Sequence, residues 1–211
     1  MYYRCYNRHV SIIDLSVPLN EQTPVYPGDP ATSIKPAGVF VEDGYNDHLI
    51  SVGTHVGTHI DAPFHMIADG KTLDQIPVEQ FVGRGCYIEA KDGFDLEAIK
   101  QADIREGDIV LFHTGIIARY KEPSYYEKYP KLPEDIARYL VDMKVKMVGM
   151  DMSGPDHEPF KTHKILLGGG VLIIENLTDL DQLADKEFTV YALPIKLEVD
   201  GAPARVIAQL A

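Results

Sequence analysis

The sequence contains no tryptophan and only two cysteines, and its 20 lysine and arginine residues are outnumbered by 32 aspartate and glutamate residues. The two cysteines, Cys5 and Cys86, are too few for a disulfide framework or a zinc site built from thiolates, and we expect both to stay reduced. With a formal net charge of −12 at pH 7, the chain lacks the excess of positive charge that binds nucleic acid or anionic membranes. We therefore expect neither kind of partner.

Long hydrophobic runs are also missing. The longest apolar stretches, such as residues 171–174, fall far short of the roughly 18 residues that a membrane-spanning helix requires. The first residues carry charge and no apolar segment follows them, so we expect no secretory signal and a cytoplasmic protein. Hydrophobic residues make up 45% and charged residues 25% of the 211 residues. These proportions are typical of a globular protein, and the length suits a single domain spanning residues 1–211.

Short strands and helices are interspersed along the chain, without an internal repeat or a domain linker. Residues 132–144 form the clearest helix, because Pro133 suits a first turn and apolar residues recur on one face. The dipeptide Asp200-Gly201 predicts a hairpin turn between two strands. Together these features indicate an α/β or α+β fold with a mixed sheet. The expected strands are 12–17, 49–52, 108–112, 146–150, 171–174, 189–199 and 204–210, and the other expected helices are 77–82 and 96–102.

The segment from His55 to His65 concentrates side chains that bind metals or transfer protons. Its eleven residues, H-V-G-T-H-I-D-A-P-F-H, contain three of the eight histidines and one aspartate. A straight strand would hold His55 and His59 about 13 Å apart, whereas two nitrogens on one metal ion lie at most about 4 Å apart. Pro63 also interrupts a regular helix. The chain must therefore bend, and Gly57 is the position where a bend costs least.

Further metal ligands must come from later in the sequence. The candidates are His157, Glu158, His163 and Glu175. Three glycines at residues 168–170 predict a turn between a helix end and a strand, and such a turn would bring His163 back towards Glu175.

The run from His55 to His65 resembles the H-x-G-T-H-x-D-x-P-x-H signature of the cyclase family, which includes bacterial arylformamidase (kynurenine formamidase) and isatin hydrolase. The resemblance extends over most of the chain. It implies the fold of that family, an α/β (α+β) swivelling β/β/α-like architecture with flanking helices around a mixed sheet. The other segments that carry the resemblance are residues 24–29, 69–70, 149–153 and 175–177.

The resemblance also implies a centre with two divalent metal ions. His55, His59 and Asp61 would bind the first ion, Asp61 and His163 would bind the second, and Glu175 would contact both. Five ligands are two more than a single catalytic zinc site uses, and two carboxylates that can bridge suit ions about 3.5–4 Å apart. A ligand set of nitrogen and oxygen without thiolate suits zinc and allows manganese.

Two further positions match functional residues of the family. His65 matches the catalytic general acid/base, and Tyr26 falls where the formamidases have a tryptophan that contacts the substrate. This chain has no tryptophan at all. The replacement of that tryptophan by Tyr26 puts the kynurenine substrate in question more than the hydrolytic chemistry. The family pattern also selects His163 rather than His157 as the late histidine ligand, and it implies a homodimer or homotetramer.

The expected reaction is metal-dependent hydrolysis of a small amide, in which metal-bound hydroxide attacks the carbonyl and His65 transfers protons. The resemblance places arylformamides first, such as N-formylkynurenine of tryptophan catabolism, and isatin-like cyclic amides or lactones next. A different class of enzyme, a non-haem iron oxygenase, would use His59, Asp61 and His163 as its triad, but it would leave Glu175 without a role. A non-catalytic metal-binding module is the third interpretation.

Overall fold

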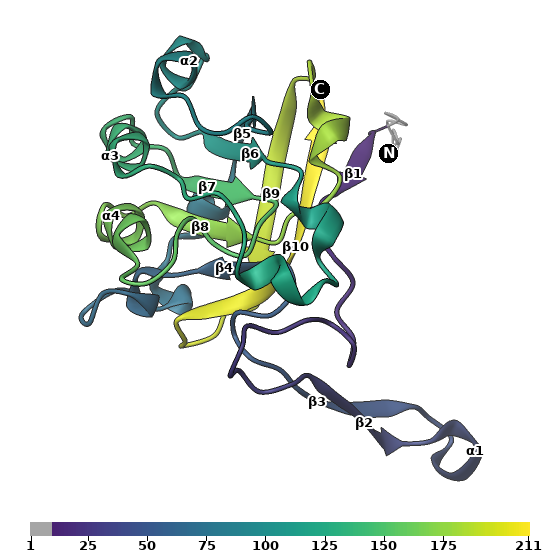
Figure 1. Cartoon of the computed structure of the whole chain (residues 1–211). Helices are drawn as coiled ribbons and strands as arrows, with labels where there is room; N and C mark the ends of the chain where they lie inside the picture. The colour runs from purple at the N-terminus through teal and green to yellow at the C-terminus, as the bar shows by residue number, and fades with distance from the viewer. Residues whose placement is uncertain (1–9) are drawn as a thin grey trace, which may run out of the picture.

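Strands form the centre of the molecule. The computed structural model describes residues 10–211, and the larger of its two sheets has eight strands. These strands are β1 (Ile12–Asp14), β4 (His59–Asp61), β5 (Val82–Glu89), β6 (Ile109–His113), β7 (Met147–Met150), β8 (Leu172–Glu175), β9 (Phe188–Pro194) and β10 (Gly201–Leu210). Their order is β1-β10-β4-β8-β7-β6-β5-β9, and β9 also pairs with β10, so the sheet closes into a barrel-like core (Figure 1). The predicted mixed α/β fold is confirmed.

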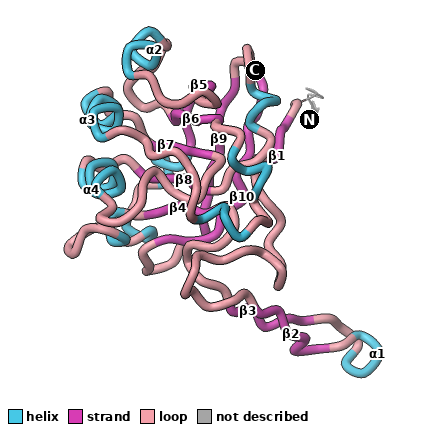
Figure 2. Tube along the Cα trace, in the orientation of Figure 1, coloured by secondary structure: helices cyan, strands magenta, loops and turns pink. Residues whose placement is uncertain are grey.

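Three helices lie in a row beside the parallel strands β5, β6, β7 and β8, as Figure 2 shows. They are α2 (Leu96–Gln101), α3 (Glu134–Asp142) and α4 (Lys161–Gly168). None of the helices within residues 10–211 is long and apolar enough to cross a bilayer. Besides α1 (Phe40–Asp43), the other helical turns are the short 3₁₀ helices η1 (Pro63–His65), η2 (Leu73–Gln75), η3 (Val78–Phe81), η4 (Ile116–Arg119), η5 (Pro123–Tyr126) and η6 (Leu180–Leu183).

The parallel strands are apolar throughout because both of their faces are buried. In β6, Ile109 and Leu111 belong to one hydrophobic cluster, which strands β4, β9 and β10 complete. Val110 and Phe112 belong to a second cluster, which α2, α3 and α4 complete. Strands covered on both sides have continuous apolar sequences rather than alternating ones. This burial explains why β6, β7 and β8 were predictable from their apolar runs.

The helix predicted at residues 132–144 is confirmed as α3, which is two residues shorter at each end. Pro133 occupies the N-cap position with an extended backbone. Ile136 and Leu140 are fully buried on the face that packs against the sheet. The helix ends before Lys144, whose φ of +54° is left-handed.

The predicted antiparallel pairing of the strands on either side of Asp200-Gly201 is confirmed, but the tight turn predicted at this dipeptide is wrong. β9 ends at Pro194, which lies opposite Ala204 of β10. The first three residues of β10, from Gly201, pair with β4 instead. Because β10 changes partners along its length, a six-residue connection rather than a tight turn separates it from β9.

Several other boundaries differ from the predictions. The first strand stops at Asp14, and Ser16 forms only an isolated bridge with Leu177. The helix expected at 77–82 is the 3₁₀ helix η3. Strand β5 was not predicted, because its glycines at 83 and 85 lower strand propensity.

The second sheet forms a projecting arm, which we define as residues 33–51. It consists of β2 (Ser33–Gly38), α1 (Phe40–Asp43) and β3 (Asp47–Ser51), and its two strands pair only with each other. Figure 1 shows the arm extending away from the body, with α1 at its tip. Every residue of β3 is exposed. The prediction covered β3 but missed β2, which contains a proline.

The one cysteine within the described residues is a free thiol. Cys86 is partly buried in β5, and burial raises the pKa of its thiol to about 11. At neutral pH it therefore stays protonated, the form that is a poor nucleophile. Cys5 lies outside the described residues.

A close contact between β5 and β9 gives the first prediction. A Cβ atom added at Gly85 would lie 1.9 Å from Cε2 of Phe188, whereas one added at Gly168 would first meet Ile67 at 3.6 Å. Because overpacking forces side chains and backbone to shift, we expect Gly85→Ala to lower the free energy of unfolding by about 1–3 kcal/mol. The control Gly168→Ala leaves it unchanged or raises it slightly. Urea denaturation of both variants checks this, and equal stabilities would contradict the predicted contact.

Candidate metal centre

The histidine-rich segment bends where the sequence predicts. Gly57 adopts a left-handed φ of +66°, and β4 begins two residues later at His59. The bend brings the ring of His55 to within 5.2 Å of the ring of His59, measured between centroids. The carbonyl oxygen of Gly57 also accepts hydrogen bonds from Nδ1 of His59 and Nδ2 of Asn176, both at 2.8 Å. Hydrogen bonds thus join the backbone of the bend to His59 and to Asn176, the residue after Glu175.

Strand pairing brings the later ligand candidates to the same place. β4 and β8 are antiparallel, with His59 directly opposite Glu175, and His59 Nε2 lies 3.3 Å from Glu175 Oε2. His163, on α4, places Nε2 at 3.3 Å from the other carboxylate oxygen of Glu175. The glycine turn after α4 therefore returns His163 to Glu175 as predicted. Glu175 stands between the two imidazoles.

Asp61 is the second acidic centre of the cluster. His55 Nδ1 lies 2.7 Å from Asp61 Oδ1, and His59 Nε2 lies 3.4 Å from the same oxygen. Asp61 is fully buried and Glu175 nearly so, at 0% and 6% exposed. Two carboxylates at this depth are stable only with compensating positive charge beside them.

Each of the three imidazoles has one nitrogen held by a neighbour and the other turned towards a carboxylate. Nδ1 of His59 is held by Gly57, and Nδ1 of His163 lies 2.5 Å from Asp156 Oδ1. Nε2 of His55 lies 2.8 Å from Asp200 Oδ2. Histidines that ligate metals typically have their second nitrogen fixed in this way. The arrangement leaves His55 Nδ1, His59 Nε2 and His163 Nε2 converging on Asp61 and Glu175.

Two buried polar atoms of the cluster lack a hydrogen-bond partner among the described residues. They are His59 Nε2 and Asp61 Oδ2, and leaving such atoms unsatisfied costs about 1–3 kcal/mol each. A divalent cation would satisfy both, since imidazole nitrogen and carboxylate oxygen are ligands of zinc and manganese. His55, His59 and Asp61 can offer donor atoms within 4.8 Å of one another, as can Asp61, His65 and His163. The donor set therefore fits a metal.

The electrostatics of the cluster couple metal binding to proton release. Burial opposes charge on His59, but the neighbouring carboxylates of Asp61 and Glu175 raise its pKa to about 10. Burial likewise opposes charge on His55 and His163, yet their acidic partners raise the pKa of each to about 9. The same contacts lower the pKa of Asp61 well below its ordinary value against the effect of burial. A metal cation bound by these histidines would replace the protons, so acidification would weaken its binding.

His65 lies at the mouth of the cluster, at the end of η1. Its ring centroid is 3.9 Å from that of His55 and 6.1 Å from that of His163. Partial burial lowers the pKa of His65, although the charges of Asp61 and Glu175 act in the opposite direction. A neutral imidazole at this position can accept a proton.

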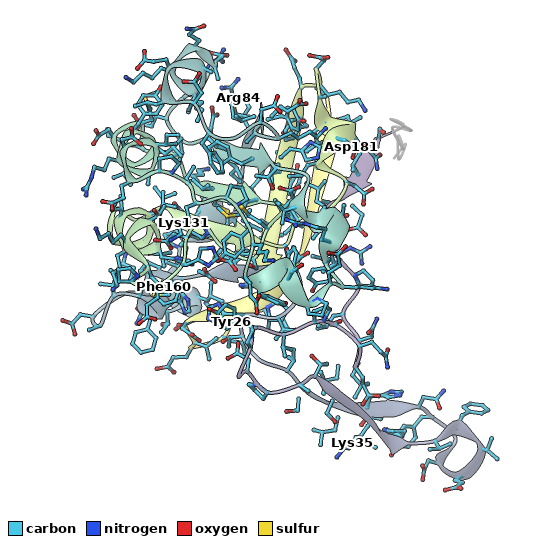
Figure 3. The ribbon with its side chains drawn as sticks, viewed as in Figure 1. Tyr26, Lys35, Arg84, Lys131, Phe160 and Asp181 are labelled. Atoms are coloured by element: carbon cyan, nitrogen blue, oxygen red, sulfur yellow. The ribbon has the colours of Figure 1, made fainter. Side chains whose placement is uncertain are left out.

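A cavity of about 310 Å³ opens onto these side chains. Its walls include Tyr26, whose ring meets the ring of Tyr126 edge-on at a centroid distance of 5.7 Å. Figure 3 labels Tyr26 near the root of the arm and Phe160 on the same side of the body. Tyr129 and Phe160 also line the cavity. The cavity therefore combines an aromatic wall with a polar floor of histidine and carboxylate.

A sequence-family model described as "Putative cyclase" matches residues 13–157. The chain belongs to the cyclase family.

Alignments of this cyclase with individual relatives cover nearly the full length of both chains. A kynurenine formamidase of Bacillus cereus is 32% identical, covering 92% of this chain and 95% of the relative. A kynurenine formamidase of Bacillus anthracis is 30% identical with the same coverage of 92% and 95%. A solved structure described as a potential metal-dependent hydrolase with cyclase activity is 33% identical, with a TM-score of 0.80 over 95% of this chain and 98% of the other. Isatin hydrolase A from Labrenzia aggregata, bound to benzyl benzoate, is 26% identical, with a TM-score of 0.85 over 95% and 93%.

Other polar candidates of this cyclase lie outside the cluster. His157 stacks on Tyr129 at a centroid distance of 4.0 Å and lines a different surface depression from the cavity. Asp151 accepts hydrogen bonds from Thr114 and the backbone of Gly115. It therefore holds the end of β6 rather than a metal ligand.

Two acidic residues and most of the aromatic wall were missed by the sequence reasoning. Asp156 and Asp200 hold His163 and His55, but they are 7 and 145 residues away from them in the chain. The run that contains Tyr126 and Tyr129 was a detectable signal, because three tyrosines crowd residues 125–129.

The position of the late histidine yields a prediction about metal content. We expect His163→Ala to lose at least one bound ion, because its Nε2 faces Glu175, whereas His157→Ala keeps the wild-type content. Elemental analysis of both variants after loading with zinc or manganese and gel filtration measures this directly. Loss of metal from the His157 variant with retention in the His163 variant would reverse the assignment.

Proposed function

We propose that this cyclase is a metal-dependent amidohydrolase that acts on carbon–nitrogen bonds other than peptide bonds, with an arylformamide such as N-formylkynurenine as substrate. The observation that carries the proposal is the convergence of three imidazoles on two buried carboxylates beside an aromatic cavity. The kynurenine formamidases at 30–32% identity and nearly full coverage support the choice of substrate. For location we propose the cytoplasm, where free thiols stay reduced.

The proposed ligands are those expected from the sequence. His55, His59 and Asp61 would hold one ion, Asp61 and His163 a second, and Glu175 both, with zinc preferred over manganese. Ions bound there would lower the pKa of a coordinated water and polarise the substrate carbonyl. The buried, partnerless atoms of His59 and Asp61 support the presence of a metal.

His65 is the proposed general acid/base. Its lowered pKa keeps the imidazole neutral, so it can take a proton from the attacking water. As the carbon–nitrogen bond breaks, the protonated imidazole gives a proton to the departing aryl amine. An N-formyl substrate thus yields formate and the free amine.

The aromatic wall supports an aryl group on the substrate. Tyr26, which is 41% exposed, and Tyr126 meet at right angles and present ring faces and edges to the cavity. A second candidate substrate is an isatin-like cyclic amide or a lactone, which the isatin hydrolase structure at a TM-score of 0.85 favours. Both substrates present an aromatic ring and a carbonyl to the same centre.

Hydrolysis assays on both substrates test the proposed reaction. The zinc- or manganese-loaded enzyme should hydrolyse N-formylkynurenine faster than isatin, and removal of metal by a chelator should abolish the activity. His65→Ala should lower kcat by about 10²–10⁴-fold, because a general acid/base contributes that much, while its metal content stays at the wild-type level. Full activity in the chelated enzyme or in the variant would overturn the mechanism. Faster turnover of isatin would select the second substrate.

We also propose that the cyclase is a homodimer in which the arm of each copy packs on the other. Of fifteen exposed large hydrophobic residues among the described residues, six lie on the arm: Val39, Phe40, Val41, Tyr45, Leu49 and Ile50. Between 42% and 91% of each of these residues is exposed, so together they form an apolar patch on the order of several hundred Å². A standard interface buries about 800 Å² per partner, so most of one could be supplied by the arm.

A second copy of this chain is the occupant that suits the arm best. The arm carries three acidic residues and one lysine, a balance that disfavours an anionic membrane. A second exposed apolar surface lies on the body, where Leu19, Leu193 and Ile195 border a groove of about 590 Å³. One chain thus has both halves of an isologous contact. A two-stranded hairpin is also marginal in water without such a partner.

The proposed dimer contact of the arm can be tested with substitutions that leave the metal cluster unchanged. Light scattering should find a dimer, and the double variant Leu49→Asp, Ile50→Asp should raise its dissociation constant at least about tenfold, because buried charge without a partner opposes association. Val78→Asp alters a residue that is 62% exposed on η3 and serves as the control with unchanged assembly. A wild-type protein that is monomeric at all concentrations would contradict the proposal, and a tetramer would extend it.

A further inference from the structure

Asp200, in the Asp-Gly pair that predicts a turn, lies against the histidine cluster. Asp200 Oδ2 is 2.8 Å from His55 Nε2 and 3.5 Å from His65 Nδ1. His55 is a proposed metal ligand and His65 the proposed acid/base, and their rings lie 3.9 Å apart. One carboxylate oxygen therefore contacts both residues.

The backbone holds Asp200 in this position from two sides. Its carbonyl oxygen accepts a hydrogen bond of 2.8 Å from the backbone nitrogen of Ala62. The next residue, Gly201, lies opposite Asp61 in the pairing of β10 with β4. Asp200 is thereby attached to the strand that carries Asp61.

Gly201 allows the close approach. A Cβ atom at this position would lie 2.7 Å from Cε1 of His55 and 2.8 Å from the carbonyl oxygen of Ile60. Real Cβ atoms do not tolerate such distances, so a glycine is required where the chain passes the imidazole. The Asp-Gly pair thus serves the cluster rather than a turn.

We propose that Asp200 is a positioning residue that fixes the tautomer of His55 and the orientation of His65. An ionised carboxylate oxygen only accepts hydrogen bonds and can accept two, so it accepts the hydrogen bond of His55 Nε2–H at 2.8 Å and faces Nδ1–H of His65 at 3.5 Å. His55 Nδ1, the nitrogen turned towards Asp61, is then left unprotonated and free to bind a cation. For His65, the same contact leaves Nε2 as the atom that exchanges protons with the reaction.

This role deepens the proposed function and rests on it. It makes the metal ligand and the acid/base depend on a single side chain, because a shift of Asp200 moves both imidazoles. Neighbours that hold metal ligands in this way typically account for 10–100-fold in metal affinity or activity. Asp156, at 2.5 Å from His163 Nδ1, is the corresponding neighbour on the other side of the cluster.

The experiment measures zinc affinity and steady-state kinetics in three variants of full-length protein. Asp200→Ala removes both contacts, Asp200→Asn keeps an oxygen acceptor but loses the charge, and Glu198→Gln removes a neighbouring exposed charge as the control. Zinc affinity is measured by competition with a chromophoric chelator, without substrate. Circular dichroism and thermal unfolding check that each variant is folded.

We expect Asp200→Ala to weaken zinc binding by about 10–100-fold, Asp200→Asn to weaken it less, and Glu198→Gln to match the wild type. At saturating zinc, Asp200→Ala should lower kcat at least about tenfold with little change in KM, because His65 is no longer aligned. Zinc affinity within twofold of wild type in a folded Asp200→Ala variant would overturn the proposal. If the wild type hydrolyses no amide while Asp200→Ala still loses zinc affinity, the proposed function fails and the positioning role at His55 stands.

Discussion

Two buried carboxylates impose the central constraint on this structure. Asp61 and Glu175 lie on neighbouring strands of the sheet, almost without access to water. Negative charge at such depth is stable only beside positive charge. The chain supplies three imidazoles, two from the segment that begins at His55 and one from α4, and the pairing of each with a carboxylate raises its pKa. A cluster that stores protons in this way is suited to exchange them for metal cations.

The closed sheet decides where this cluster forms. β4 lies between β10 and β8 and is antiparallel to both. One neighbour places Glu175 beside His59, and the other places Gly201 beside Asp61. Helix α4 precedes β8 and brings His163 to the same end. The three-residue strand β4 therefore brings site residues from the second half of the chain next to His59 and Asp61.

The cavity above the cluster is built from irregular segments. Tyr26 comes from the loop before the arm, and Tyr126 and Tyr129 come from η5 and the residues after it. The arm starts seven residues after Tyr26 and ends four residues before His55. Contacts made by the arm can thus affect both the aromatic wall and the bend at Gly57.

The sequence by itself determined the apolar strands β6, β7 and β8, helix α3 and the bend at Gly57, because burial on both faces, one-sided apolar periodicity and the reach of a metal ion are local constraints. Residue types alone left His157 and Glu158 open as further candidates, and the resemblance to the cyclase family implied the set of five ligands. Only the tertiary structure decided that β10 leaves β9 for β4, which turned Asp200 from a turn residue into a neighbour of His55. Long-range pairing, which no local pattern encodes, likewise chose Tyr126 and Tyr129 as wall residues and separated His157 from the cluster.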